Sequence, residues 1–198
     1  MKLNVIPKAK LVEGRWYVGC GRNGNVALLP DDDFWIGSKF SDPANGVLIL
    51  GESTYGEDPR LFQYVPSWCR GELPKPDRTF SRIFNAFSGT KTSPANNAKR
   101  EAFWATIAFA NFVQKSVGST NKDKATSKHF RIAAKLLPGY LHHIRPRGVL
   151  ILGIEQAKYS APIIRAAGIP HVACPHPTGY GIKTTILQAA WNDLQKQL

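Results

Sequence analysis

One hexapeptide, Gly-Val-Leu-Ile-Leu-Gly, occurs twice in the chain, at residues 46–51 and again at residues 148–153. Continuous apolar runs of this kind are typical of strands that are covered on both faces, as in a parallel sheet. The residues that flank the two copies do not match, so we interpret the identity as shared strand chemistry rather than as an internal duplication. Two such strands predict an α/β fold with helices on both faces of the sheet.

Helix and strand signals alternate from residue 46 to the C-terminus. Asp77 can cap a helix that Gly89 ends, and the aromatic stripe of this helix is expected to face the core. The alternation predicts a doubly wound, three-layer α/β sandwich with a mostly parallel, four-stranded central sheet. The stripe consists of Phe80, Ile83, Phe84 and Phe87. The other predicted elements are a strand at 105–110 that ends at Asn111, a helix from Ser127 toward His142 and His143 that Pro138-Gly139 kinks or interrupts, a helix at 155–167 that contains Pro162, a strand at 171–173 and a helix at 183–198.

The N-terminal residues have a different pattern. Residues 11–19 and 25–29 alternate loosely around Asn23-Gly24, a favoured turn dipeptide, and predict a β-hairpin. We expect one domain over residues 1–198, with a hairpin extension at 1–45 and the α/β core at 46–198. Two long connections, 58–76 and 115–128, are expected to be functional or mobile loops.

Charge and cysteine content restrict the partners. Lys and Arg outnumber Asp and Glu by 26 to 14, a formal net charge of +12, which favours a polyanionic partner such as nucleic acid, although a merely soluble basic protein is the alternative. The cysteines Cys20, Cys69 and Cys174 include no Cys-x-x-Cys pair for a metal, and their number fits a reduced cytoplasmic interior. No apolar run has the length of a membrane span or a secretory signal, so we expect no membrane partner.

Polar residues follow the first and last predicted strands of the core. Residues 51–56, Gly-Glu-Ser-Thr-Tyr-Gly, come after the first, and residues 176–181, His-Pro-Thr-Gly-Tyr-Gly, come after the last. Both segments would lie at the carboxyl edge of an open sheet, where such folds bind ligands. The first segment lacks the Lys-Ser/Thr of a phosphate-binding P-loop and the glycine spacing of a dinucleotide site, so we expect no nucleotide cofactor.

Together with Asn111, which ends a middle strand, these segments resemble the motifs of the uracil-DNA glycosylase superfamily in order and spacing. The resemblance rests on residues 47–56, 107–113 and 171–180 and covers roughly residues 46–198. It implies a DNA glycosylase that needs no metal or cofactor and hydrolyses the N-glycosidic bond of an extruded uracil or other deaminated or modified pyrimidine. In this reaction the sugar becomes oxocarbenium-like and the base leaves as an anion, so both charges need stabilisation.

The resemblance assigns roles to the residues of the three motifs. Glu52 would act beside the sugar, by positioning water, as a base or as an electrostatic stabiliser, with Glu57 and Asp58 in reserve; alternatively it caps a helix or pairs with a cation. His176 would donate a hydrogen bond from a neutral imidazole to a pyrimidine carbonyl, unless it is merely packed in a turn. The predicted base-binding residues are Gly51, Ser53, Tyr55 and Asn111.

Among these base-binding residues, Asn111 would match the edge of uracil with its amide, or else cap its own turn. Tyr55 aligns with the position where an aromatic ring crowds C5 of the base and rejects thymine, although it could equally be a wall of the cleft. Trp68 and Phe62 are candidates to stack on the extruded base, with core or surface packing as the alternative for each.

The last motif also predicts contacts with DNA, single- or double-stranded, by a monomeric protein. The backbone of the segment before the final helix could bind a phosphate at the positive helix end, and its tyrosine could wedge into the duplex. Lysines elsewhere could supply sequence-independent phosphate contacts or form a solvated surface. The predicted DNA-binding residues are Thr178, Gly179, Tyr180 and Lys183, supported by Lys115, Lys122, Lys124 and Lys128.

The chain also departs from the family pattern. The best-known members have Asp where Ser53 stands and His where Gly56 stands, and the branch with a Gly-Glu opening binds an iron-sulfur cluster through four cysteines that are absent here. The sequence therefore predicts an outlying member that is monofunctional, since no lysine lies in the motif loops for lyase chemistry. Three alternatives stay open: excision of a modified base from foreign phage DNA as a defence, a catalytically silent DNA-binding relative, and a hydrolase of small nucleosides.

Overall fold

The computed structural model describes residues 9–12, 15–20, 25–29, 34–42, 45–54, 61–73, 77–114, 117–118 and 123–198, with the backbone alone for 9–29 and 62–63. Its core is an α/β structure around a mixed five-stranded sheet with the strand order β4-β6-β5-β7-β8. Six α-helices are present among these described residues.

The two copies of the hexapeptide form the central pair of strands, β5 (Val47–Gly51) and β7 (Gly148–Leu152). Both strands are buried along their whole length, as expected for strands covered on both faces. They pair in parallel with an offset of one residue, so that Val47 lies opposite Gly148 and Leu50 opposite Ile151. The prediction of two buried parallel strands is therefore confirmed.

Three further strands complete the sheet. β6 (Ile107–Asn111) runs parallel to β5, and β8 (His171–Cys174) runs parallel to β7. β4 (Phe34–Ile36) adds an antiparallel edge beside β6. The prediction of four strands was thus wrong by this one strand, which is too short to show a period in the sequence. Because β4 belongs to the central sheet, the boundary drawn between residues 45 and 46 also falls too late in the chain.

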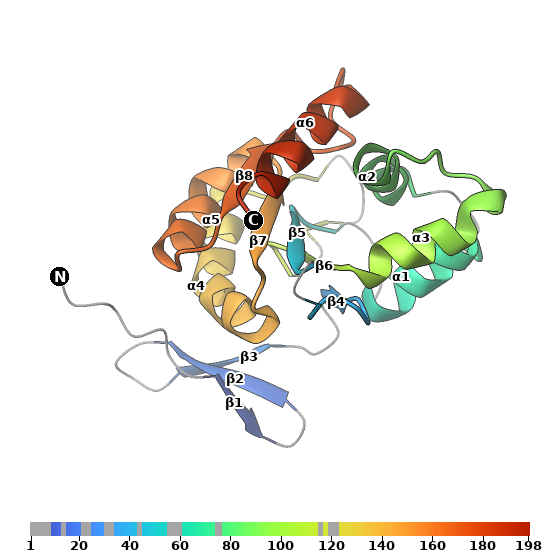
Figure 1. Cartoon of the computed structure of the whole chain (residues 1–198). Helices are drawn as coiled ribbons and strands as arrows, with labels where there is room; N and C mark the ends of the chain where they lie inside the picture. The colour runs from blue at the N-terminus through green and yellow to red at the C-terminus, as the bar shows by residue number, and fades with distance from the viewer. Residues whose placement is uncertain are drawn as a thin grey trace.

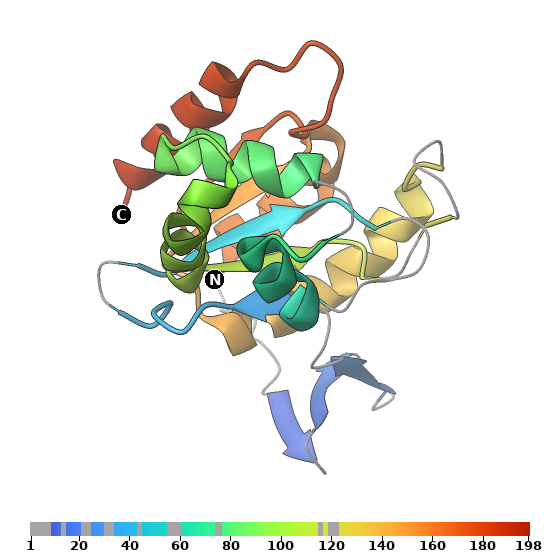
Figure 2. The same ribbon diagram turned by 90° about the vertical axis from the view of Figure 1, so that its right-hand side faces the viewer.

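Helices cover both faces of the sheet (Figures 1 and 2). α4 (Ser127–Ile144) and α5 (Ile154–Ala166) pack on one face, against side chains that include Leu48 and Val149. The other face, which includes Ile49 and Leu150, is covered by α1, α2, α3 and α6. These four helices span Leu61–Arg70, Arg78–Ser88, Asn97–Ala105 and Thr184–Gln195.

The predicted helix ends are largely confirmed. Asp77 caps α2 by accepting a hydrogen bond from the Phe80 amide at 2.8 Å, and Gly89 ends it with a left-handed φ of 67°. The N-cap of α4 is Thr126, one residue before the predicted cap Ser127, and the helix runs through Pro138 without interruption. Its continuity shows that packing of the buried face outweighs the loss of one backbone donor.

Two helices were missed. The connection 58–76 contains α1, and residues 94–105 form a 3₁₀ turn (Pro94–Asn96) followed by α3, so the next strand begins at Ile107 rather than at residue 105. Trp68 of α1 is buried in an aromatic cluster with Phe80 and Trp104. It is therefore part of the core and not a platform for an extruded base.

A separate three-stranded antiparallel sheet lies in the N-terminal part, with β1 (Ala9–Val12), β2 (Arg15–Cys20) and β3 (Asn25–Leu29). The single strand expected at 11–19 is divided between β1 and β2, and β2 pairs with β3. The turn dipeptide Asn23-Gly24 lies outside the described residues.

Candidate active site

A pocket of about 980 Å³ opens at the carboxyl edge of the sheet. Its floor comes from the ends of β5 and β6, its walls from the segment after β8 and from residues 124–127, and its far ends from the starts of α2 and α5. Since the chain leaves β5 for β6 on one side and β7 lies on the other, this is the edge at which the strand order reverses, the usual ligand position in open α/β folds. The pocket lies at the upper limit of small-ligand sites and is larger than one nucleobase requires.

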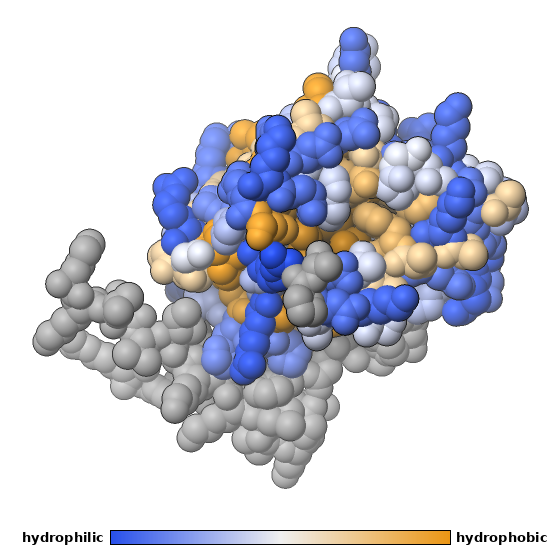
Figure 3. Space-filling model, viewed as in Figure 1, coloured by the Kyte–Doolittle hydropathy of each residue, from blue (hydrophilic) through white to orange (hydrophobic). Residues whose placement is uncertain are grey.

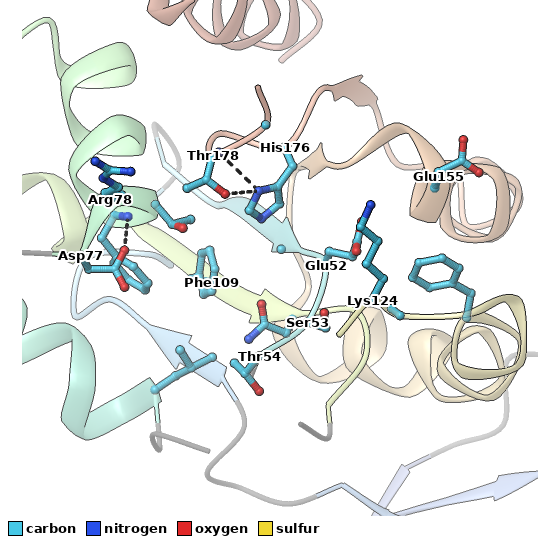
Figure 4. Close-up of a pocket in the computed structure, with 18 of the residues that line it drawn as sticks. Glu52, Ser53, Thr54, Asp77, Arg78, Phe109, Lys124, Glu155, His176 and Thr178 are labelled. Carbon is cyan, nitrogen blue, oxygen red and sulfur yellow. Dashed lines mark hydrogen bonds between the residues drawn. The ribbon is translucent and has the colours of Figure 1, made fainter. Parts of the chain in front are cut away.

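Glu52 and His176 both line this pocket, and in Figure 4 the Glu52 side chain lies beside Lys124 while the His176 ring lies next to Thr178. They are far apart in the sequence, and the parallel strands β5 and β8 bring them to one edge. Asn111, Gly51 and Ser53 line the same pocket, as do Thr178 and Gly179. Of the predicted site residues, Tyr55 lies outside the described part of the chain, as do Glu57 and Asp58.

Backbone hydrogen bonds fix the segment that holds Glu52. Beyond the ends of the strands, the amide of Phe112 donates to the Gly51 carbonyl at 2.8 Å, and that of Val113 donates to the Glu52 carbonyl at 2.9 Å. The segment after β6 thus continues to hold the segment after β5. The backbone that carries the Glu52 side chain is therefore held in place without help from a bound ligand.

The carboxyl group of Glu52 lies in a half-buried position between opposing charges. Burial raises its pKa above the ordinary value of 4.5, the neighbouring Glu155 raises it further, and Lys124 acts in the opposite direction. Figure 4 shows Lys124 beside Glu52. The close approach of Gly153 makes room for the carboxylate, because a β-carbon at this glycine, whose φ is 142°, would lie 3.1 Å from Glu52 Oε2.

His176 is held by Thr178. The Thr178 amide donates to Nδ1 at 3.4 Å, and the Thr178 hydroxyl lies 3.0 Å from the same nitrogen. A backbone amide can only donate, so Nδ1 acts as an acceptor and the proton of the neutral ring lies on Nε2. Burial lowers the pKa of His176 below 6.5, with Asp77 acting in the opposite direction, so the ring is neutral at pH 7.

Asp77 has a second role that its capping position did not reveal. Its Oδ1 caps α2, and its Oδ2 accepts a hydrogen bond from the Tyr64 hydroxyl at 2.7 Å. Both residues line the pocket, and burial, followed by this hydrogen bond to Asp77, raises the pKa of Tyr64. At the pocket end next to α1 and α2, the proton of the Tyr64 hydroxyl is therefore held in its hydrogen bond to Asp77.

Asn111 ends β6 with a buried side chain. Its amide oxygen lies so close to the Gly51 Cα that a β-carbon there would be 2.5 Å from Oδ1, which explains why residue 51 is glycine. Among the described residues, the Asn111 side chain has no hydrogen-bond partner, and the Ser53 hydroxyl oxygen is likewise buried without one. The Asn111 amide, which lines the pocket, is thus available to a ligand, whereas the Ser53 hydroxyl oxygen has almost no exposed surface.

The segment after β8 forms a tight loop that ends at Lys183, the N-cap of α6. The amides of Thr178 and Gly179 are used inside the loop, the latter in a 2.9 Å bond to the His176 carbonyl, so these two amides cannot also hold a phosphate as expected. Tyr180 is fully exposed at the tip, and Lys183 is exposed. In Figure 2 this loop extends beyond the layer of helices.

Arg82 of α2 was not singled out by the sequence. Its Nη1 donates to the Pro177 carbonyl and its Nη2 to the Ile182 carbonyl, so one guanidinium closes the base of the loop. Lys124 and Lys128 are exposed, whereas Lys115 and Lys122 lie outside the described residues. Figure 3 shows hydrophilic side chains over much of one face, with apolar areas between them.

Comparison of the chain with protein-family models and with curated proteins found no match in either case. Within the described part of the chain, no cluster of three or more His, Cys, Asp or Glu side chains is arranged to hold a metal ion. Over the same residues, no helix has both the length and the apolar character of a membrane span.

Proposed function

We propose that the protein is a monofunctional DNA glycosylase that hydrolyses the N-glycosidic bond of an extruded uracil or other modified pyrimidine. The observation that supports this most is the meeting of Glu52 and His176 in one pocket with the buried amide of Asn111. The proposal includes a monomer that acts on DNA in the cytoplasm. Removal of a modified base from foreign DNA would use the same chemistry and the same residues.

In the proposed reaction, His176 stabilises the departing base. Its Nε2–H donates to the carbonyl oxygen that becomes negative as the glycosidic bond breaks, and the neutral ring stays in this tautomer because Thr178 holds Nδ1. A fixed donor in a half-buried site acts more strongly than one in water because it needs no reorganisation.

Glu52 acts on the other side of the bond. Its carboxylate faces the developing positive charge on the sugar and orients the water that attacks C1′. Burial raises the pKa of Glu52 because its carboxylate is incompletely solvated. The cation that forms in the transition state therefore interacts with this carboxylate more strongly than it would in water. Ser53 stands where the best-known relatives have Asp, so Glu52 is the acidic residue of the first motif in this chain.

Asn111 selects the base in the proposed complex. Its amide can donate to O4 and accept from N3–H of a uracil, and burial makes a mismatched base costly because the amide would lose its partners. The volume beyond one nucleobase leaves room for a substituent.

Incubation with labelled oligonucleotides that contain uracil, hypoxanthine, xanthine or hydroxymethylated cytosine, followed by alkaline cleavage of abasic sites, tests the proposal. Strand breaks should be lost in Glu52→Gln and in His176→Ala. They should remain in Glu101→Gln, which makes the same chemical change on the exposed surface of α3. Mass spectrometry of bases released from natural and phage DNAs identifies the substrate without a prior choice. Binding of DNA without release of any base would contradict the proposal and favour a silent DNA-binding protein.

A further inference from the structure

The loop between β8 and α6 is closed by a side chain from a distant helix. Arg82 lies on α2, and its two terminal nitrogens bind carbonyl oxygens at positions 177 and 182, which are 95 and 100 residues away in the chain. The guanidinium therefore bridges the two ends of a six-residue segment that includes the fully exposed Tyr180.

We propose that Arg82 is a positioning residue that holds the loop 176–182 in its working shape before any ligand binds. The fixed fork of an arginine suits this role, since its two donors reach two acceptors in one plane. The Pro177 carbonyl follows His176 directly, so the anchor fixes the backbone next to the imidazole.

Internal bonds alone hold this loop weakly. They include the bond from the Gly179 amide to the His176 carbonyl at 2.9 Å and that from the Ile182 amide to the Gly179 carbonyl at 3.3 Å. Gly181 adopts a left-handed φ of 71°. A short loop with two glycines and an exposed tip has many alternative conformations, so an external anchor at both ends removes much of that freedom.

The charge of Arg82 stays available. Among the described residues, no carboxylate lies within 4.0 Å of its guanidinium, and both of its described hydrogen bonds go to neutral carbonyls. A half-buried cation thus lies beneath the loop and favours an anionic partner above it. This part of the inference rests on the proposed function, in which the partner is DNA.

Hydrogen exchange measured by mass spectrometry on the free protein tests the anchor without any substrate. In Arg82→Met, peptides covering residues 176–182 should exchange about tenfold to a hundredfold faster, as expected for loss of hydrogen bonds with a charged donor. Arg165→Met, which removes the same charge from the exposed end of α5, should leave this exchange unchanged. Wild-type exchange of the loop in Arg82→Met would overturn the inference.

Arg82→Lys separates position from charge and serves if Arg82→Met does not fold. Lysine keeps the charge but lacks the two-pronged guanidinium, so residues 176–182 of Arg82→Lys should exchange nearly as fast as those of Arg82→Met. On a substrate oligonucleotide, kcat should fall in both variants with little change in KM. If Arg82→Lys behaves as wild type while Arg82→Met alters only the salt dependence of DNA binding, the residue supplies charge and does not position the loop. A wild-type protein that releases no base would contradict the glycosylase proposal, but the exchange result would still decide the role of Arg82.

Discussion

Replacement of His176 by alanine removes the donor proposed to stabilise the departing base. Loss of one preorganised donor to a developing anion typically lowers kcat by about 10²- to 10³-fold, or about 3–4 kcal/mol. The structure favours this range over a smaller effect, because the ring is half-buried and its tautomer is set by Thr178. We expect KM to change little, since the bond to the base strengthens only as negative charge develops.

The same replacement has a small expected effect on folding. The described partners of the ring are the amide and hydroxyl of Thr178, and loss of such bonds costs roughly 1 kcal/mol. For a chain of this size that corresponds to a fall in Tm of about 2–4 °C, which calorimetry can measure. A large fall in kcat with a small fall in Tm therefore identifies a chemical role.

His176→Gln provides the matched variant. The glutamine amide reaches about as far as Nε2 and can donate, so single-turnover rates on an oligonucleotide should recover about tenfold relative to alanine, a part of the donor's contribution. An alanine variant whose rate stays within about twofold of wild type, or equal rates for alanine and glutamine, would refute the assignment of His176 as the donor.

Three other predictions concern the pocket and the loop. Because Glu52 must be ionised and burial raises its pKa above 4.5, the single-turnover rate should fall as the pH drops through that raised pKa. The residual rate of Glu52→Gln should show no such fall. His176 is neutral above its own lowered pKa and causes no fall there, so a fall that persists in Glu52→Gln would contradict the assignment to Glu52. Gly51→Ala should destabilise the fold by about 1–3 kcal/mol in urea denaturation, because the new methyl group would lie 2.5 Å from Asn111 Oδ1, and a neutral result would mean that the amide can move. Tyr180→Ala should leave the free energy of unfolding within about 0.5 kcal/mol of wild type and lower turnover of duplex DNA by about tenfold more than that of single strands; equal losses on both would contradict a wedge.

The sequence predicted the features that depend on local patterns. Buried parallel strands have continuous apolar runs, and β5, β6 and β7 were found in this way, whereas the short, mostly partly exposed β8 was expected only as a strand at 171–173. Since parallel strands end at one edge, the approach of Glu52 and His176 followed from strand order alone. The caps of α2 were equally local, because Asp77 and Gly89 satisfy backbone groups within one turn.

Features that depend on distant contacts were not predicted. α1 contains Pro66 and its stability comes from packing, with Trp68 against Phe80 and Trp104, which no local pattern shows. In the sequence, Arg82 resembles any surface cation of α2, because its two carbonyl partners are distant in the chain. The antiparallel strand β4 was missed because three residues are too few to define a period.

The one-residue offset between β5 and β7 turns one copy of the repeated hexapeptide over with respect to the other. Leu48 and Leu50 face α4 and α5, whereas the corresponding leucines of the second copy, Leu150 and Leu152, face the opposite layer. Each side of the molecule therefore meets the same four apolar side chains from the middle of the sheet, one valine, one isoleucine and two leucines. The interior volume at the centre is balanced between the two layers, whereas the residues that follow the two copies differ, with Glu52 after the first and Ile154 after the second.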